Sequence, residues 1–443
     1  HTTTKLKMMT MTTTTLLQRL SSLINETEID RLARERGIIQ RQRKINLTSL
    51  IWTLIIASGG SAQRTIAGLK GHYHQLTGDW IARSSIYDRL SLKLAQLLKD
   101  IVVDITKKRM DRSLKPRGHL SRFIRVLALD SSSTHLPDQL ASKYPGTRTA
   151  AGMKLHCLFD IFGGHIHKVK QSSERVADLA AWRHLGPWLR GSLLLVDLGY
   201  YSYQFLSRVD RNGGAFLSRI KSNINPRIVK NNRPVRRGLA INVVGLKLQY
   251  VLYNIKRKVL DVNVEVIVKR NKYNGKQSRE KQIFRLIAIY DEEQRGYHGY
   301  LTNLPVDELA AEDVTETYGL RWQVEIFFKA LRQQHSLDEL PSSKKKVIDC
   351  LFWASILSSL VSHEGLELAR EETPKGRCLP ILRWSKYFAL AVRDLVICLR
   401  APRSKFSREL AERAWQLLLQ LAPDPNLNRK KRAIKPEIVD QYA

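Results

Sequence analysis

The segment from Tyr318 to Arg332 constrains this chain most, because it reads as a helix that carries one carboxylate among cations. It contains no proline, its one glycine lies near the start, and most of its residues are good helix formers. At about 100° per residue, one face collects Tyr318, Arg321, Glu325, Lys329 and Arg332. A second, apolar stripe holds Leu320, Val324, Phe327, Phe328 and Leu331. We therefore expect the helix to dock on a core through the apolar stripe.

This spacing fits two interpretations. In an ordinary amphipathic helix, Arg321, Glu325 and Lys329 form ion pairs on a solvated face. In a functional site, the same carboxylate among cations suits the joint binding of a metal ion and phosphates. Two aspartates upstream favour the second interpretation.

Asp130 and Asp197 each follow an apolar, strand-like run, from Phe123 and from Ser192 respectively. An isolated aspartate in such a place is more often a cap or turn residue. However, ligands also gather at the carboxyl ends of strands in α/β sheets. With Glu325, the two aspartates supply three hard oxygen donors, which suits Mg²⁺. Two such ions, roughly 4 Å apart, would clamp an in-line displacement at phosphorus.

The charge balance points to a polyanionic partner. The chain has 74 Lys and Arg against 41 Asp and Glu, a formal net charge of +33 over 443 residues. Nucleic acid is the first candidate partner and an anionic membrane the second. No membrane segment is expected, since Ser49–Ser58 is too short and Val347–Val361 is interrupted by Asp349 and several serines.

The four cysteines are scattered and show no metal-binding spacing, which fits a reducing cytoplasm and indicates neither zinc nor disulfides.

The N-terminal part reads as helical. Residues 1–15 are rich in Thr and Met, and we expect a disordered leader there. Residues 16–117 are predicted to form a helical, helix-turn-helix-like DNA-binding domain, in which Ser84–Leu98 begins like a capped helix. Candidate DNA-end contacts are Arg41, Arg43, Arg83 and Arg89, although exposed solubilising charge explains each of them about equally well.

The middle of the chain reads as an α/β core with a β-rich insertion. Residues 118–218 show the order β-β-β-α-β-α-β, which predicts a mixed sheet flanked by helices. Residues 219–304 are predicted to form a meander with strands at Leu246–Lys256, Leu260–Lys269, Gln282–Asp291 and Tyr300–Asn303. Residues 305–340 return to the core with the Glu325 helix, and residues 341–443 form a helical region with a basic tail.

These motifs resemble a known family. Tyr318, Arg321, Glu325 and a base at 332 follow the spacing Y-x2-R-x3-E-x6-K of bacterial insertion-sequence transposases of the DDE type, the Tyr-Arg-Glu-Lys group. Arg332 replaces the last lysine of that pattern, which changes a point charge into a planar fork. Asp130 in Leu-Asp-Ser-Ser and Asp197 in Val-Asp-Leu-Gly-Tyr match the first and second acids of the family.

The resemblance implies a multidomain protein: an N-terminal helical DNA-binding region, a ribonuclease H-like core interrupted by the β insertion, and a C-terminal helical region that dimerises. It implies Mg²⁺-dependent cut-and-paste transposition, in which the enzyme nicks the element's ends, forms and opens a hairpin, and joins the ends to target DNA. Mn²⁺ would substitute for Mg²⁺. The partners would be double-stranded DNA and a second copy in a synaptic complex, in the bacterial cytoplasm at the nucleoid.

The resemblance also assigns roles to residues around the acids. Phosphate-binding candidates are Tyr318, Arg321, Lys329 and Arg332, although Tyr318 could equally be a tyrosine at the edge of the core. A flipped base would stack on an aromatic ring, for which the candidates are Tyr297, His298 and Tyr300. Three rival functions stay open: a metal-dependent DNA nuclease, a catalytically silent DNA-binding relative, and a basic architectural protein.

Overall fold

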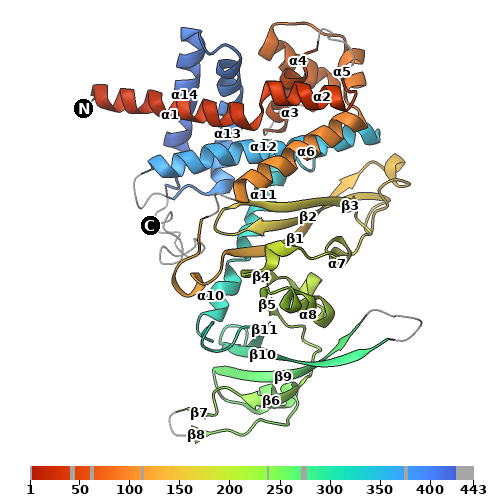
Figure 1. Cartoon of the computed structure of the whole chain (residues 1–443), viewed down its shortest axis with the longest axis vertical. Coiled ribbons are helices and arrows are strands. Elements are labelled where there is room, and N and C mark those ends of the chain that lie inside the picture. Colours follow the sequence, from red (N-terminus) through yellow and green to blue (C-terminus); the bar gives the residue numbers. More distant parts are fainter. Residues whose placement is uncertain are drawn as a thin grey trace.

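One mixed β-sheet forms the centre of the fold, and helices from both ends of the chain pack together above it (Figure 1). The structure, a computed structural model, describes residues 2–39, 45–59, 64–110, 114–236, 239–270, 277–373 and 378–425. Arg41 and Arg43 lie outside these residues.

Among the described residues, nine strands form this sheet in the order β3-β2-β1-β4-β5-β11-β10-β9-β6. Strands β1, β4 and β5 run parallel, and the other pairs are antiparallel. The bounds are β1 (Arg125–Leu136), β2 (Ala151–Asp160), β3 (His165–Ser173), β4 (Ser192–Val196), β5 (Ala215–Arg219), β6 (Arg227–Asn231), β9 (Val259–Lys269), β10 (Arg279–Asp291) and β11 (Gly296–Thr302). A separate small hairpin joins β7 (Val235–Arg236) to β8 (Leu239–Ala240).

The helices divide into those of the upper body and those beside the sheet (Figure 1). The upper body contains α1 (Thr2–Leu23), α2 (Glu26–Glu35), α3 (Leu47–Ser58), α4 (Ile66–Thr77), α5 (Arg83–Arg89), α6 (Leu92–Met110), α12 (Lys345–Glu372), α13 (Ile381–Arg400) and α14 (Lys405–Leu421). The helices beside the sheet are α7 (Asp178–Ala181), α8 (Tyr203–Arg211), α9 (Leu248–Asn254), α10 (Val314–Gly319) and α11 (Trp322–Gln334). Short 3₁₀ turns are η1 (Gly118–Leu120), η2 (Asp138–Leu140), η3 (Pro187–Leu189) and η4 (Leu198–Tyr200).

The sheet separates two apolar cores. Alternate side chains of β1 point to opposite faces, so Val126 and Ala128 join the core under the upper helices, while Leu127 and Leu129 join the core beneath. Helix α11 docks on the upper core through its apolar stripe, as predicted, and the rings of Phe327 and Phe159 lie 5.0 Å apart.

Helix α12 unites the two ends of the chain. Every residue from Val347 to Leu366 is buried, against α6, α3 and α1 from the N-terminal part and α13 from the C-terminal part. By length and composition, α12 is the one described helix that could cross a membrane, but the qualifying stretch lies wholly inside the protein.

Three sequence predictions are wrong. Thr2–Thr15 are not disordered but belong to α1, which is docked because Thr12, Thr13 and Leu16 are buried. The predicted strand at Leu246–Lys256 contains helix α9, whose Leu248 and Val251 are buried at helical spacing. The single helix from Ser84 to Leu98 is broken at Leu90 into α5 and α6.

The helix predicted from Tyr318 is also divided. Tyr318 lies in α10 and Glu325 in α11, and a tight turn at Leu320 and Arg321 separates the two helices. At this turn the Arg321 amide donates to the Tyr318 carbonyl at 3.0 Å, a bond to the third residue back rather than the fourth.

Buried His335 predicts a pH-dependent stability. Its side chain is 2% exposed at the end of α11, and burial lowers its pKa from about 6.5 to about 3. Between these values the unfolded chain binds the proton more tightly, so stability is present above pH 6.5 and is lost as the pH falls.

We therefore expect the free energy of unfolding to fall by about 2 kcal/mol more between pH 7 and pH 5 in wild type than in His335→Gln. Urea titrations followed by circular dichroism at both pH values measure this. His184→Gln, at an exposed position, is the control and should keep the wild-type pH dependence. An unchanged pH dependence in His335→Gln would contradict the prediction.

Candidate active site

The three predicted acids converge at one place on the sheet. Strands β1 and β4 pair in parallel, with Leu129 opposite Val196. The next residue on each strand is therefore Asp130 or Asp197, and their side chains leave neighbouring backbones. Asp130 lies within the long strand β1 rather than at its end, whereas Asp197 directly follows β4. Glu325 reaches the same place from α11.

Arg321 lies between the three carboxylates. Its Nη1 is 3.5 Å from Oδ2 of Asp130, and its Nε is 3.9 Å from Oδ1 of Asp197. Its Nη2 donates a hydrogen bond to Oε1 of Glu325, one helical turn along the chain. The Arg321 side chain is 14% exposed and that of Asp130 19%, whereas Glu325 and Asp197 are 32% and 39% exposed, so solvent screens the pairs with Glu325 and Asp197 more. Arg321 was predicted to bind phosphate, but here it neutralises the acids.

The environment of Asp130 disfavours its charge. Burial raises the pKa of Asp130 to about 6, helped by the neighbouring carboxylates, while the Ser131 backbone N–H and Arg321 act in the opposite direction. That N–H donates to Oδ1 of Asp130 at 2.7 Å. Additional positive charge beside Asp130 would favour its ionised form.

A groove of about 1100 Å³ opens beside the acids, between β1 and α11. Asp130 and Glu325 lie at its wall, and both Lys329 and Arg332 project into it from the exposed face of α11. Among the other lining residues are Ser131, His135, Arg148, Lys154, Glu174 and Trp322. A groove with acids at one wall and cations around it can hold a phosphate backbone at a metal centre.

Tyr318 belongs to the core edge, the second of its two predicted roles. Its side chain is 9% exposed, and its hydroxyl donates to the Val196 carbonyl at 3.3 Å. Burial raises its pKa to about 12. The Arg321 guanidinium lies 5.9 Å from the Tyr318 ring centre. Tyr318 therefore contacts Arg321 through its ring and the residue before Asp197 through its hydroxyl.

The three predicted base-stacking residues do not line the groove. Tyr300 is buried and packs edge-on against Tyr318. The hydroxyl of Tyr297 donates to the carbonyls of Ile255 and Arg257. His298 contacts Asp291 and Arg219. Trp322 and Phe328 do line the groove, and of these two Trp322 is 43% exposed whereas Phe328 is buried.

Of the predicted DNA-end contacts, Arg83 is exposed at the start of α5, which follows α4 after a turn at Gly78. Arg89 has an internal role, because its Nη1 donates to the Ile38 carbonyl at 3.1 Å.

Sequence reasoning missed a fourth carboxylate near the acids. Oδ1 of Asp178 accepts hydrogen bonds from Ser131 at 2.9 Å and from Lys154 at 3.1 Å. Asp178 also lies near Asp197, because the position that a Cβ on Gly199 would occupy is 3.7 Å from Oδ2 of each of these aspartates. No spacing signal marks Asp178, since the strand pairing of β1 with β2 brings its partners together. Trp322 was overlooked although it lies within the signature segment, next to Arg321.

Comparison with known proteins identifies the class. Residues 121–361 match the family described as "Transposase DDE domain". The transposase for insertion sequence element IS231E of Bacillus thuringiensis subsp. finitimus is 25% identical over 370 residues, which cover 77% of each chain. The transposase for IS1151 of Clostridium perfringens is 22% identical over 386 residues, covering 78% of this chain and 80% of that one. A solved piggyBac transposase synaptic complex with hairpin DNA is 10% identical, with a TM-score of 0.45, over 95% of this chain and 88% of that one.

A match over more than half of the chain, with the acids inside it, places the protein among the enzymes that cleave DNA and transfer its strands. The chain belongs to the Transposase DDE domain family and, within it, is similar to the IS231 transposases.

The family implies divalent metal catalysis, and the residues present fit such an ion by donor type. Asp130, Asp197 and Glu325 supply carboxylate oxygens, as Mg²⁺ prefers. In the described part of the chain, no three acids, histidines or cysteines already lie close enough together to bind a metal. Among Asp130, Asp197 and Glu325, the guanidinium of Arg321 lies between the carboxylates. A metal and Arg321 would compete for the same oxygens.

This geometry predicts that Arg321 weakens metal binding in the absence of DNA. Arg321→Gln should bind Mn²⁺ more tightly than wild type, by roughly tenfold, because a competing positive charge has been removed. Titration of DNA-free protein with Mn²⁺, followed by electron paramagnetic resonance, measures the affinity.

Arg332→Gln is the matched control, since it removes a cation from the same helix without removing one that contacts the acids in this structure. Its Mn²⁺ affinity should change much less. Equal affinities for wild type and Arg321→Gln would rule out the competition.

Proposed function

We propose that this protein is a cut-and-paste transposase that nicks and excises its insertion sequence and joins the 3′ ends to target DNA. The observation that carries the proposal is the convergence of Asp130, Asp197 and Glu325 on one cation at the edge of a basic groove. The family match and the similarity to the IS231 transposases support it.

We propose two Mg²⁺ ions as cofactors, with Mn²⁺ as a substitute. Asp130, Asp197 and Glu325 would hold them. When bound, the ions would activate the attacking oxygen and stabilise the leaving one. The chain's own part is to orient the three carboxylates and to bring phosphates to them. Lys329 and Arg332 would hold the phosphates on either side of the scissile bond through charge-assisted hydrogen bonds. Arg321 would take a phosphate once it leaves the acids.

The hairpin step is proposed from the resemblance alone. If a base is displaced beside the cleavage site, Trp322 has the position to stack on it, because its indole is exposed in the groove next to Arg321. Tyr297, His298 and Tyr300 support the sheet instead.

We further propose that β3, β2, β1, β4 and β5 form a ribonuclease H-like core. Their strand order and the parallel run of β1, β4 and β5 support this. The proposed division is a helical DNA-binding domain at 16–117, the core at 118–218 and 305–340, the β-rich insertion at 219–304, and a helical dimerisation region at 341–443.

The proposed partners are the double-stranded terminal repeats, target DNA and a second copy of the chain. The exposed Arg83 at the start of α5 is the supported candidate for end recognition. Because helix α12 is buried in the core, the proposed dimer interface would involve α13 and α14. Leu390 on α13 and Phe406 on α14 are 63% and 67% exposed. We propose the bacterial cytoplasm, at the nucleoid, as the location.

The test is cleavage and joining of a short duplex that carries the element's own end, in Mg²⁺. Glu325→Ala should bind this duplex as wild type does, but nick it more slowly by a factor on the order of 10²–10³, because one of three metal-binding carboxylates is missing. Single-turnover assays on gels measure nicking and joining.

Glu339→Ala, an exposed glutamate on the loop that follows α11, is the control and should keep wild-type rates. Nicking without joining would favour a nuclease. Binding without cutting by wild type, in Mg²⁺ and in Mn²⁺, would favour a silent DNA-binding protein.

A further inference from the structure

The linker 303–313, between β11 and α10, leads directly to the helices that bear Tyr318 and Glu325. We propose that Arg285, on β10, is a positioning residue for Glu325 because it clamps this linker to the β-rich insertion. The inference rests on the proposed function, since it gives Arg285 a part in the same reaction.

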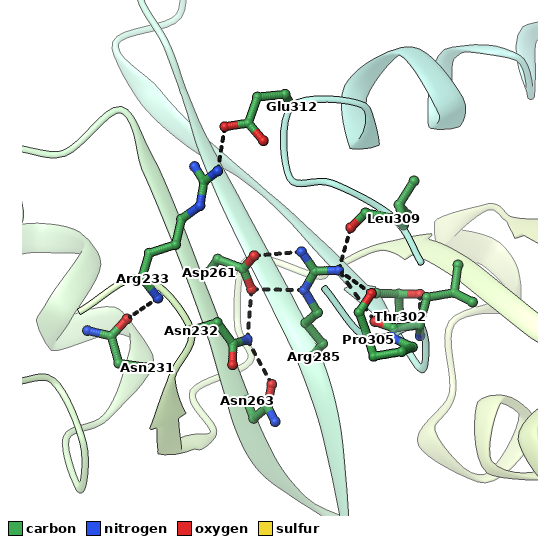
Figure 2. Close-up of polar contacts among 11 residues, drawn as sticks. Asn231, Asn232, Arg233, Asp261, Asn263, Arg285, Thr302, Pro305, Leu309 and Glu312 are labelled. Atoms are coloured by element: carbon green, nitrogen blue, oxygen red, sulfur yellow. Dashed lines mark hydrogen bonds and ion pairs between the residues drawn. The ribbon is translucent and has the colours of Figure 1, made fainter. Parts of the chain in front are cut away.

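Arg285 donates to three carbonyls of the linker. Its Nη1 lies 2.6 Å from the Leu309 oxygen and 3.0 Å from that of Pro305 (Figure 2). It also lies 3.4 Å from the Leu304 oxygen. The side chain is 4% exposed. A single buried cation therefore fixes both ends of a six-residue stretch of linker.

Asp261, on β9, holds the other side of Arg285. Its Oδ1 accepts from Nε of Arg285 at 2.9 Å, and its Oδ2 accepts from Nη2 at 2.6 Å, a bidentate pair (Figure 2). The Asp261 side chain is fully buried. Asn232 donates through Nδ2 to Asp261 and to Asn263, both at 2.9 Å, which fixes the carboxylate in turn.

A second, exposed ion pair ties the same linker to the insertion. Arg233 follows Asn232, and its Nη2 lies 2.5 Å from Oε1 of Glu312 (Figure 2). Both partners are more than one-third exposed, so this pair contributes little on its own. The buried Arg285 is the contact that can determine where the linker runs.

Stability alone does not account for a buried ion pair at this place. Removing two charges from water costs about as much as their attraction returns, and apolar residues of similar size often serve as well. An apolar pair could not donate to the three carbonyls, however. What Arg285 adds is a defined path for the linker.

The linker path determines the position of the active-site helices. Leu309 and Ala311 are buried in the second half of the linker, as is Val314 directly after it, so this half is anchored in the core, whereas Pro305, Val306 and Asp307 are exposed. Helix α10 begins at Val314, and the tight turn at Leu320 and Arg321 joins it to α11. A shift of the linker would therefore be passed to Glu325, where small displacements are costly for catalysis.

The test is the double variant Arg285→Leu with Asp261→Leu, which replaces the buried ion pair by two apolar side chains. Changing both residues removes the clamp without leaving an unpaired buried charge. We expect the thermal midpoint to fall moderately, because the linker carbonyls lose their donor, while the protein stays folded. In DNA-free and metal-free protein, we expect amide hydrogen exchange to rise at least tenfold in segment 303–325 while β9 and β10 stay protected.

With end DNA at saturation, the nicking rate of this double variant should fall at least tenfold, while its dissociation constant for the DNA stays within twofold. The matched control is Glu265→Leu with Lys281→Leu, which removes a partly exposed pair, 3.1 Å apart, between the same two strands. It should leave both exchange and nicking unchanged.

Wild-type exchange in segment 303–325 together with a wild-type nicking rate would overturn the proposal. Raised exchange with an unchanged rate would also overturn it, because the linker would then be loose without consequence for Glu325. If wild type itself does not cut DNA, the proposed function fails, and the exchange measurement still decides whether Arg285 positions the linker.

Discussion

The parallel pairing of β1 with β4 is the constraint on which the active site depends. Its register puts Leu129 opposite Val196, so Asp130 and Asp197 come from adjacent points of two hydrogen-bonded strands. A slip of one residue would turn one of the carboxylates to the opposite face of the sheet. The third acid depends on no strand register, because α11 is docked by its own apolar stripe, and the rotation and position of this helix place Glu325.

Three carboxylates gathered in a half-buried site repel one another, and the protein offsets this with a cation of matching shape. The three nitrogens of Arg321 each approach a different acid. A lysine, as a single point charge, could not reach all three in this way. Even so, burial keeps the pKa of Asp130 raised, so the site is still short of positive charge. A divalent ion at these carboxylates would supply further positive charge, in competition with Arg321.

Much of this site could be predicted from the sequence, because local patterns carry it. The apolar runs before Asp130 and Asp197 and the helical spacing around Glu325 are visible along the chain. The inward turn of Arg321 could not be predicted, because it depends on acids from two distant strands. The role of Arg285 could not be predicted either, because only the pairing of β9 with β10 brings Asp261 into contact with it. The strand prediction for segment 246–256 was wrong because its apolar residues fit both the two-residue period of a strand and the 3.6-residue period of a helix. Burial of Leu248 and Val251 favours the helix.

The proposed β-rich insertion, residues 219–304, is not a separate unit. Its strand β11 pairs with β5, so β9 and β10 extend the same sheet that holds Asp130 and Asp197 (Figure 1). The insertion thus reaches the acids by two routes, through the sheet to the aspartates and through Arg285 and the linker to Glu325. Hydrogen-bonded strands make the first route stiff. The second crosses a loop, which would be free to move without a buried contact. The clamp therefore lies where the chain would otherwise lose the alignment of Glu325 with the two aspartates.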